Sequence, residues 1–255
     1  MSLRAALEQM SHRIVIRRRL PAPFAAARIY TSPEGGLRYL RLHMDRVDPV
    51  LIRLATETVR PGNTVWDIGA NIGLFSFAAA VAAGSGGYVL SVEPDTILVR
   101  LLRRSAAAGR HHAPVEVFPA AVADKCGVAR FCIARRNRST SHLAGFGTTQ
   151  TGGIRATELV PTVSLDSLAD HFPPPDVIKI DVEGAEVQVL MGATAVLSAH
   201  PRIICEVAGK NAVAVRDLLG ESGYTFYDGE LPISQQLPVR EAGPNTLAIS
   251  GPWPG

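Results

Sequence analysis

From residue 64 onward, two patterns of apolar and polar positions alternate along the chain. Short apolar runs are each followed by a stretch in which apolar residues recur at helical spacing. This pattern indicates strands that alternate with helices, and therefore a parallel α/β sheet. The expected strands are 64–68, 88–92, 115–118, 177–181 and 202–207, and the expected helices are 48–59, 74–83, 97–108, 185–199 and 211–222. Residues 224–227 and 246–249 are expected to form a closing antiparallel pair.

The rhythm is lost in two segments. Before residue 45 the pattern predicts a short strand at 14–16, and a hairpin that joins 28–30 to 37–40 through the turn-forming residues 32–36. Between the third and fourth core strands, 128–133 and 159–163 look extended, and Asp124–Gly127 has the composition of a hairpin turn. We therefore divide the chain into an N-terminal extension, 1–47, and a catalytic domain, 48–255. The domain carries a β-rich insertion at about 124–165, and the extension is expected to act as a lid or an oligomer contact.

Composition excludes several classes of protein. The chain has 255 residues, 47% of them hydrophobic and 19% charged, which is typical of a folded domain rather than a disordered one. No apolar run approaches the roughly 18 residues of a membrane span, so we expect no membrane partner. The N-terminus lacks the apolar core of a signal peptide. Three cysteines without paired spacing indicate reduced thiols and a cytoplasmic location.

The net charge of +3 hides an uneven distribution. Residues 1–60 hold 11 arginines and 5 acidic residues, a balance of +6, so the remaining 195 residues have a balance of −3. A cluster of arginines can bind the phosphates of nucleic acid. It can also recognise an anionic small molecule or simply cover the sheet, and these alternatives stay open at this stage.

Acidic residues stand at the carboxyl ends of four expected strands. They are Asp67, Glu93, Asp181 and Glu206. Ligands of open parallel sheets bind outside these ends, and a carboxylate that ends an apolar run faces a crevice more often than a core. The four acids are therefore candidates for one common site.

The turn after the first core strand points to a cofactor. It reads Gly69-Ala70-Asn71-Ile72-Gly73, which lacks the middle glycine of the dinucleotide fingerprint, so NAD and FAD are disfavoured. Glu93 follows Gly69 by 24 residues, where an acidic side chain binds ribose hydroxyls. A nucleoside without a pyrophosphate suggests S-adenosylmethionine, whose ammonium group Asp67 would suit. The alternative is an ordinary strand–helix turn with solvated acids.

A second motif, residues 178–186, places Asp181 at the end of the fourth core strand. Glu183 and Glu186 lie at the start of the next helix, where an acid can cap free N–H groups or take part in chemistry. Both interpretations of these two glutamates stay open. Asp181 is the stronger functional candidate because it should face the crevice.

With these motifs in view, the chain resembles the FkbM-type S-adenosylmethionine-dependent methyltransferases of the class I, Rossmann-like fold. The matching segments are VWDIGANIGLF (65–75), VEPD (92–95), AVADKCG (121–127), VSLDSL (163–168), PDVIKIDVEGAEVQVLMG (175–192) and RIICE (202–206). The resemblance implies a doubly wound, mostly parallel seven-stranded sheet with an antiparallel closing strand. It also implies a cofactor site built from Asp67, Gly69, Ala70, Asn71, Gly73, Glu93, Pro94, Ala121 and Val122, with Asp124 a weaker candidate for the adenine amine.

Methyl transfer to a hydroxyl requires alignment of the acceptor and removal of its proton. We expect Asp181, Glu183 and Glu206 to supply these roles. A variant is a divalent metal held by Asp181 and Glu206, which is not favoured because the sequence shows no third ligand. His142, a lone histidine in a loop, is a weak candidate for a base.

The resemblance implies O-methylation of a small molecule: a sugar, a polyketide or another secondary metabolite. Residues 181–184 lack the Asn/Asp-Pro-Pro-aromatic turn of nucleic-acid amine methyltransferases. The alternatives are a nucleic-acid-binding protein or nucleic-acid methyltransferase that uses the arginine-rich N-terminal segment, and an NAD-dependent oxidoreductase. We expect a small-molecule acceptor as the partner and regard assembly into a homo-oligomer as open.

Overall fold

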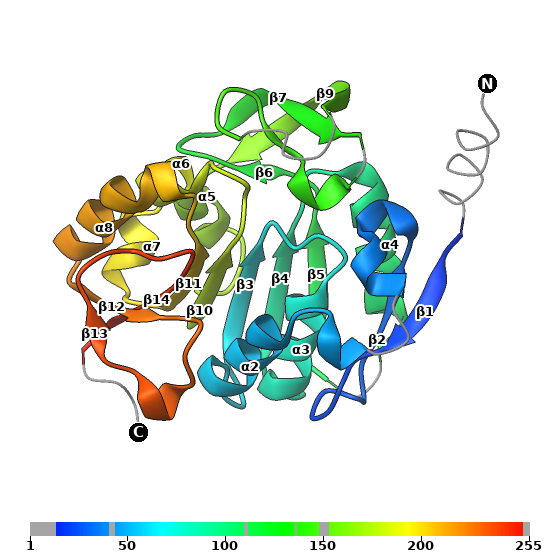
Figure 1. Ribbon diagram of the computed structural model, residues 1–255, viewed down its shortest axis with the longest axis horizontal. Coiled ribbons are helices and arrows are strands. Elements are labelled where there is room, and N and C mark those ends of the chain that lie inside the picture. Colours follow the sequence, from blue (N-terminus) through cyan, green and yellow to red (C-terminus); the bar gives the residue numbers. More distant parts are fainter. Residues whose placement is uncertain (1–13, 41–43, 110–111, 136, 148–152, 252–255) are drawn as a thin grey trace.

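The computed structural model describes residues 14–40, 44–109, 112–135, 137–147 and 153–251. In these residues the main sheet has eight strands in the order β13-β12-β14-β11-β10-β3-β4-β5 (Figure 1). Five of them are parallel: β3 (Thr64–Ile68), β4 (Tyr88–Val92), β5 (Val115–Phe118), β10 (Val177–Ile180) and β11 (Arg202–Glu206). The others are β12 (Tyr224–Asp228), β13 (Pro238–Val239) and β14 (Asn245–Ser250), and β14 runs antiparallel to both of its neighbours. The expected seven-stranded α/β sheet with its antiparallel closing strand is confirmed, and the two-residue β13 is added at the edge.

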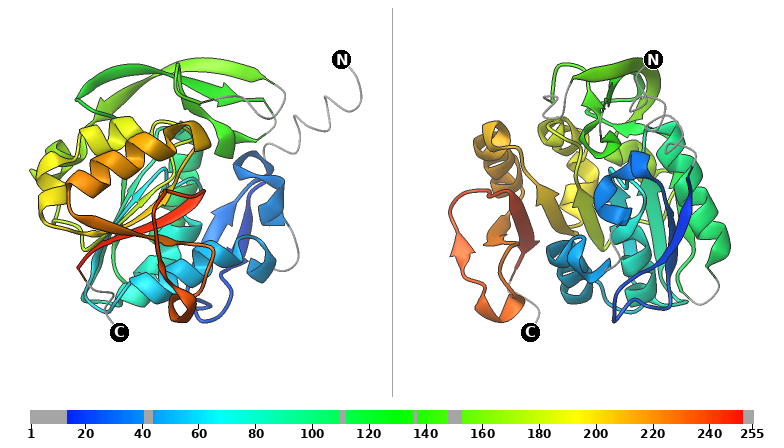
Figure 2. Two further views of the ribbon diagram at one scale, coloured as in Figure 1. Left: turned by 60° about the vertical axis from the view of Figure 1, so that its left-hand side comes forward. Right: turned by 45° about the vertical axis from the view of Figure 1, so that its right-hand side comes forward.

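Helices cover both faces of the sheet because its strands are apolar on both sides. Neighbouring positions of β3 belong to different cores, with Val65 in one and Trp66 in the other. One face carries α2 (Pro49–Thr58), α3 (Leu74–Ala83) and α4 (Thr96–Ala108), and the other carries α5 (Leu165–Ala169), α6 (Glu186–Met191), α7 (Thr194–Ser198) and α8 (Ala212–Glu221) (Figures 1 and 2). None of the helices in the described ranges has both the length and the apolar character that crossing a bilayer demands.

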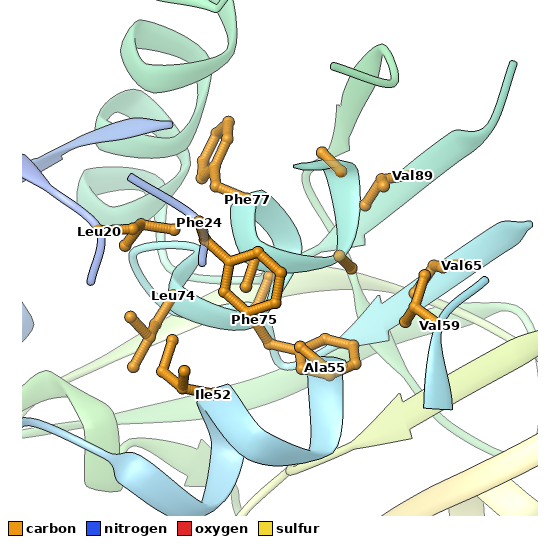
Figure 3. Packing of buried hydrophobic residues seen from close by; sticks show 14 of the residues in the cluster. Leu20, Phe24, Ile52, Ala55, Val59, Val65, Leu74, Phe75, Phe77 and Val89 are labelled. Atoms are coloured by element: carbon orange, nitrogen blue, oxygen red, sulfur yellow. The ribbon is translucent and has the colours of Figure 1, made fainter. Parts of the chain in front are cut away.

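The N-terminal segment takes part in the core on the α2–α3 face. Leu20 and Phe24 are buried in the same cluster as Ile52 of α2 and Phe75 of α3, as Figure 3 shows. Burial of large apolar side chains contributes roughly 1.5–3 kcal/mol each, so this contact fixes the segment firmly. Residues 14–40 are thus joined to the catalytic domain, while their role as a lid or an oligomer contact stays a prediction.

The hairpin expected around residues 32–36 is wrong. Strand β2 (Arg28–Thr31) pairs instead with β1 (Ile16–Arg19), which also begins two residues later than expected. The side-chain oxygen of Ser32 accepts a hydrogen bond from the backbone N–H of Glu34, and Ser32 starts a 3-10 turn, η1 (Pro33–Gly35). A second turn, η2 (Leu37–Leu40), follows. Backbone groups of these tight turns bond within the turns, and they are therefore not available to pair with β2 as a second strand.

The single helix expected over 185–199 is also wrong, because the chain forms α6 and α7 with a break at Gly192. The Gly192 N–H closes α6 on the carbonyls of Gln188 and Val189. A Cβ at Gly192 would lie 2.5 Å from the carbonyl oxygen of Ala123, so the insertion crosses the helix at this point. Helical periodicity did not reveal the break because both pieces keep their apolar residues on the same face.

The insertion between β5 and β10 forms a sheet of its own, as expected. It contains β6 (Ala121–Val122), β7 (Gly127–Ala134), β8 (His142–Leu143) and β9 (Ile154–Val163) in the order β6-β9-β7-β8. The turn at 124–127 joins β6 to β7, but it does not make a hairpin, since β9 lies between these two strands. Figure 1 shows this sheet lying across the carboxyl ends of the central strands.

Backbone contacts fix the turn after β3 from both sides. The Gly69 N–H donates to the Val92 carbonyl at 2.9 Å, and the Asp181 N–H donates to the Ile68 carbonyl at 3.0 Å. Gly69 has φ 76°, and a Cβ there would lie 1.8 Å from the Asp181 carbonyl oxygen. Only glycine satisfies both demands, so the ends of β3, β4 and β10 meet in one rigid junction.

Candidate functional site

A cavity of about 430 Å³ lies at the carboxyl ends of β3, β4, β10 and β11. This size falls in the range of small-molecule sites. Its walls come from the strand ends, from the N-terminal segment with α2, and from the insertion. The predicted site residues that line it are Gly69, Ala70, Asn71, Glu93, Pro94, Ala121, Val122, Asp181, Glu183 and Glu206. The candidates that do not line it are Asp67, Gly73, Asp124, His142 and Glu186.

A buried lysine joins the two sequence motifs beneath this cavity. The Nζ of Lys179 lies 3.2 Å from Asp67 Oδ1, 3.2 Å from Asp181 Oδ2 and 3.0 Å from the Gly69 carbonyl oxygen, to which it donates. Burial of the amine opposes its charge, but the carboxylates of Asp181 and Asp67 outweigh burial and raise the pKa of Lys179. Lys179 therefore stays charged and holds Asp181 at the cavity wall.

Asp67 is fully buried and serves this network. Its Oδ2 accepts a hydrogen bond from Ser76 Oγ at 2.6 Å, and Ser76 Oγ in turn accepts one from Ser91 at 2.8 Å. Asp67 does not line the cavity, so the structure shows a charge partner of Lys179 at this position. Direct contact between Asp67 and a cofactor ammonium group stays a prediction without support in this geometry.

Glu93 is a buried carboxylate on the cavity wall. Its Oε2 accepts the Asn71 N–H at 2.8 Å and its Oε1 accepts the Asp95 N–H at 2.9 Å. Burial raises the pKa of Glu93 to about 8, although these two N–H groups oppose the shift. Asn71 has φ 54°, which is uncommon for a residue other than glycine, and its buried Oδ1 has no hydrogen-bond partner among the described residues. Strained and unpaired polar groups of this kind concentrate at binding sites.

The wall next to Glu93 is apolar. Ala121 and Val122 of β6, Leu98 of α4 and Phe131 of β7 line it, and all four are buried. An apolar wall of this kind suits an aromatic ring. Asp124, the weaker candidate for the ring amine, is exposed and outside the lining.

Three carboxylates gather on the opposite wall. Strand register pairs Ile180 with Cys205, so the next residues, Asp181 and Glu206, are neighbours at the strand ends. The charge of Asp181, together with burial, raises the pKa of Glu206 to about 7. Burial and the charge of Asp181 raise the pKa of Glu183 to about 8. At neutral pH, Glu206 is therefore near the midpoint of its titration, where proton transfer is efficient, and Glu183 is mostly protonated.

The structure separates the two glutamates whose roles the sequence left open. Glu186 is buried and structural, because its carboxylate accepts the Gly184 N–H at 2.6 Å and the Asn211 side chain at 2.6 Å. Glu183 lines the cavity with φ 53°, a backbone conformation that is held by its surroundings. A Cβ at Gly184 would lie 2.6 Å from the Phe146 carbonyl oxygen, so the insertion packs tightly on this turn.

The sequence missed cavity residues from the N-terminal segment and the insertion. Arg38 and Tyr39 come from the first, and Asn137–Ser141 from the second. No motif marks these positions, and the segments that carry them lie outside the strand–helix rhythm. Lys179, by contrast, had a readable signal, because alternation along β10 puts it on the same face as Asp181.

An arginine in the insertion ties these segments together. Arg138 Nε donates to Glu34 Oε2 at 2.6 Å, and its NH1 donates to Asp95 Oδ2 at 2.5 Å. All three side chains are buried, and Asp95 also caps α4 through the Ile97 N–H. The insertion, the N-terminal segment and the Glu93–Asp95 corner therefore close around the cavity as one unit.

Two weaker candidates are placed elsewhere. His142 is buried in β8, outside the cavity lining, and its Nδ1 lies 3.2 Å from the Thr140 carbonyl oxygen. Within the described parts of the chain, no group of three or more His, Cys, Asp or Glu side chains is arranged as a metal site. The Asp181 oxygen nearest to Lys179 is engaged in an ion pair.

Several arginines of the described N-terminal segment lie outside the cavity lining. Arg17 and Arg104 lie over the Tyr30 ring, 5.9 and 4.0 Å from its centroid, and strand β1 carries Arg17–Arg19 beside α4. None of these arginines lines the cavity, whereas Arg38 does. The arginines of the N-terminal segment therefore lie in two different places: Arg38 lines the cavity, and Arg17–Arg19 lie on β1 outside it.

Comparison with known proteins gives a family match. The model of the family described as Methyltransferase FkbM domain matches residues 67–226. The chain is 30% identical over 177 residues to the hexuronic acid methyltransferase AglP of Haloferax volcanii, an alignment that covers 68% of this chain and 67% of the relative.

Solved structures give more distant likenesses. A methyltransferase FkbM from Methylobacillus flagellatus KT has 17% sequence identity and a TM-score of 0.49, with 85% of this chain aligned to 58% of that one. The chain thus spans little more than half the length of that protein. A precorrin-6y C5,15-methyltransferase from Geobacter metallireducens has 13% identity and a TM-score of 0.47, over 80% and 89% of the two chains.

Replacement of the buried lysine should weaken the fold. Lys179→Met leaves Asp67 and Asp181 without their cation, and loss of one partner from a buried ion pair costs about 3–5 kcal/mol. Urea denaturation should show a loss of this size, and the double variant Lys179→Met/Asp67→Asn should recover part of it. Lys125→Met, at an exposed lysine, is the control and should be nearly neutral. A loss below about 1 kcal/mol in Lys179→Met would contradict the network.

Proposed function

Since the chain belongs to the FkbM methyltransferase family, we propose that it transfers a methyl group from S-adenosylmethionine to a hydroxyl of a small acceptor, and that the acceptor is a sugar. The observation that carries the proposal is the arrangement of the cavity. A part lined by the buried Glu93 and by apolar side chains adjoins a part that contains Asp181, Glu183 and Glu206, and the pKa values of both glutamates are raised.

The residues of the first half fit the cofactor. Glu93 is positioned for the ribose hydroxyls, with Pro94 beside it, and Ala121 and Val122 for the adenine ring. Beside the backbone of Gly69 and Ala70, the unpaired Asn71 Oδ1 offers a polar group to the amino-acid end. When bound, S-adenosylmethionine supplies an electrophilic methyl group on a sulfonium, and a neutral thioether leaves.

The residues of the second half prepare the acceptor. Glu206 has the lower of the two raised pKa values, about 7, and we assign to it removal of the hydroxyl proton. Asp181 raises that pKa through its charge, and the ion pair with Lys179 keeps Asp181 in place. Glu183, on its strained turn, orients the acceptor.

Two observations support a sugar acceptor. The lining next to Glu206 includes the polar Asn245, which is paired with it across β11 and β14. The relative from Haloferax volcanii is named for methylation of a hexuronic acid. A hydroxyl on a polyketide or another secondary metabolite is the alternative that acceptor screening would reveal.

The proposal places the enzyme in the cytoplasm as a small-molecule enzyme. The three cysteines are free thiols, one exposed and two buried, which suits a reducing compartment. Nucleic acid is disfavoured as an acceptor because the carboxylates around the acceptor half repel phosphate.

Cofactor binding is the first test. Calorimetry should detect S-adenosylhomocysteine at micromolar affinity, and NAD or a random DNA duplex should give no comparable heat. Glu93→Gln should weaken this binding about tenfold, because the amide NH2 replaces one of the two oxygens that accept the Asn71 and Asp95 N–H groups, and a buried donor left without a partner costs about 1–3 kcal/mol. Glu116→Gln, an exposed change on the neighbouring strand, is the control. Equal affinity for NAD would contradict the proposal.

The proton-transfer assignment is tested by a pH profile. In the wild type, the rate should rise with pH through about 7, since Glu206 must lose its proton to act as a base. Asp181→Asn removes the charge that raises this pKa. The variant should therefore lose about 10²–10⁴ in kcat, and its residual rate should rise at lower pH than that of the wild type.

The controls separate chemistry from folding. Asp181→Asn should keep the wild-type affinity for S-adenosylhomocysteine. Asp217→Asn, at an exposed acid on α8, should behave as the wild type. A near-normal kcat, or an unchanged pH profile in Asp181→Asn, would remove Asp181 from the mechanism.

A further inference from the structure

The cations on the cavity wall differ in how far they are already neutralised. Lys179 is 6% exposed and pairs with two carboxylates, and Arg138 is 8% exposed and pairs with two more. Among the described residues that line the cavity, the other cation is Arg38, whose side chain is 42% exposed. Its nearest carboxylate oxygen, on Asp48, lies 3.7 Å away, beyond hydrogen-bond distance. Arg38 thus presents a positive charge that the protein itself satisfies only in part.

The guanidinium of Arg38 is nevertheless held in a defined orientation. Its NH2 donates to Tyr39 Oη at 3.2 Å, and it lies over the Tyr39 ring, 5.1 Å from the centroid. Tyr39 is buried, and Asp48 is fixed because its Oδ1 caps α2 through the Leu51 N–H at 3.0 Å. A guanidinium has five N–H donors in a rigid fork. The remaining donors are therefore preorganised for a planar, bidentate anion.

Arg38 acts on the acceptor half of the cavity rather than on the cofactor half. It interacts electrostatically with Asp181, Glu183 and Glu206. The raised pKa values of the two glutamates, about 8 and about 7, mean that at neutral pH they carry less negative charge than their number suggests. One further singly charged anion can therefore approach Arg38 without facing three full carboxylate charges.

We propose that Arg38 binds a carboxylate carried by the acceptor, so that the substrate class is an acidic sugar of the hexuronic acid type. This inference rests on the methyl-transfer function proposed above. A carboxylate matches the planar fork of Arg38 and carries a single charge, whereas a phosphate dianion would meet stronger repulsion from Asp48 and Asp181. Arg38 is then the residue that selects acidic over neutral sugars.

The test compares three sugars that differ at one carbon: glucuronic acid, glucose and glucose 6-phosphate. Binding to the protein saturated with S-adenosylhomocysteine is measured by calorimetry or ligand-observed NMR, and methyl transfer is measured with S-adenosylmethionine. The wild type should bind glucuronic acid more tightly than glucose by about 10- to 100-fold, the range expected for a charge-assisted pair. Arg38→Gln should abolish this preference without a change in the affinity for glucose. Arg38→Lys should keep part of it, since lysine retains the charge but not the fork.

Arg100→Gln is the matched control, because Arg100 is exposed on α4 and lies outside the cavity lining. It makes the same change in net charge and should leave all three affinities unaltered. A wild type without preference for glucuronic acid, or a preference that survives in Arg38→Gln, would overturn the proposal. Tighter binding of glucose 6-phosphate than of glucuronic acid would overturn the carboxylate assignment.

The cofactor measurements keep the two proposals distinguishable. Arg38→Gln should bind S-adenosylhomocysteine as the wild type does, because Arg38 is not placed in the cofactor half. If the wild type itself failed to bind S-adenosylhomocysteine, the methyl-transfer function would fall. The sugar preference would still be measurable on the unliganded protein, so the effect of Arg38→Gln on it would decide the role of Arg38 separately.

Discussion

The site depends on one buried cation placed between two strands. Lys179 on β10 lies directly across from Asp67 on β3, two residues before Asp181, and its Nζ also holds the Gly69 carbonyl. These contacts link a fully buried acid, the turn that borders the cofactor half and the acid that borders the acceptor half. Because an unpaired buried charge is so costly, the three groups are stable only together. The two halves of the cavity therefore keep a fixed relation to each other.

Segments outside the central sheet complete what the strand ends begin. Arg138 bonds to Glu34 and Asp95, and so draws the insertion and the N-terminal segment over the corner that carries Glu93. The central sheet provides the turn, the buried acid and the tuned carboxylates. The covering segments provide Arg38 and the polar residues of the insertion. We infer that residues of the central sheet carry out the chemistry and that the covering segments select the acceptor.

The strand–helix pattern predicted the sheet and its insertion. The strand-end acids, which meet at one edge of a parallel sheet, and the family resemblance together predicted ten cavity-lining residues. They did not predict that Asp67 is buried. In the sequence, a strand-end acid that pairs with a lysine on the neighbouring strand of the sheet cannot be told from one that faces a crevice. They could not separate Glu183 from Glu186, because the difference lies in contacts with Gly184 and Asn211. The arginine-rich segment was ambiguous for a similar reason, as only the fold assigns Arg38 to the cavity and Arg17–Arg19 to the surface beside α4.

A crystal structure of the protein with S-adenosylhomocysteine and glucuronic acid tests the central claim most directly. The account predicts ribose hydroxyls on Glu93, adenine against Ala121 and Val122, and the sulfur facing a sugar hydroxyl next to Glu206. The sugar carboxylate should lie on Arg38. A cofactor product bound elsewhere, or a sugar whose hydroxyls lie away from Asp181 and Glu206, would contradict it.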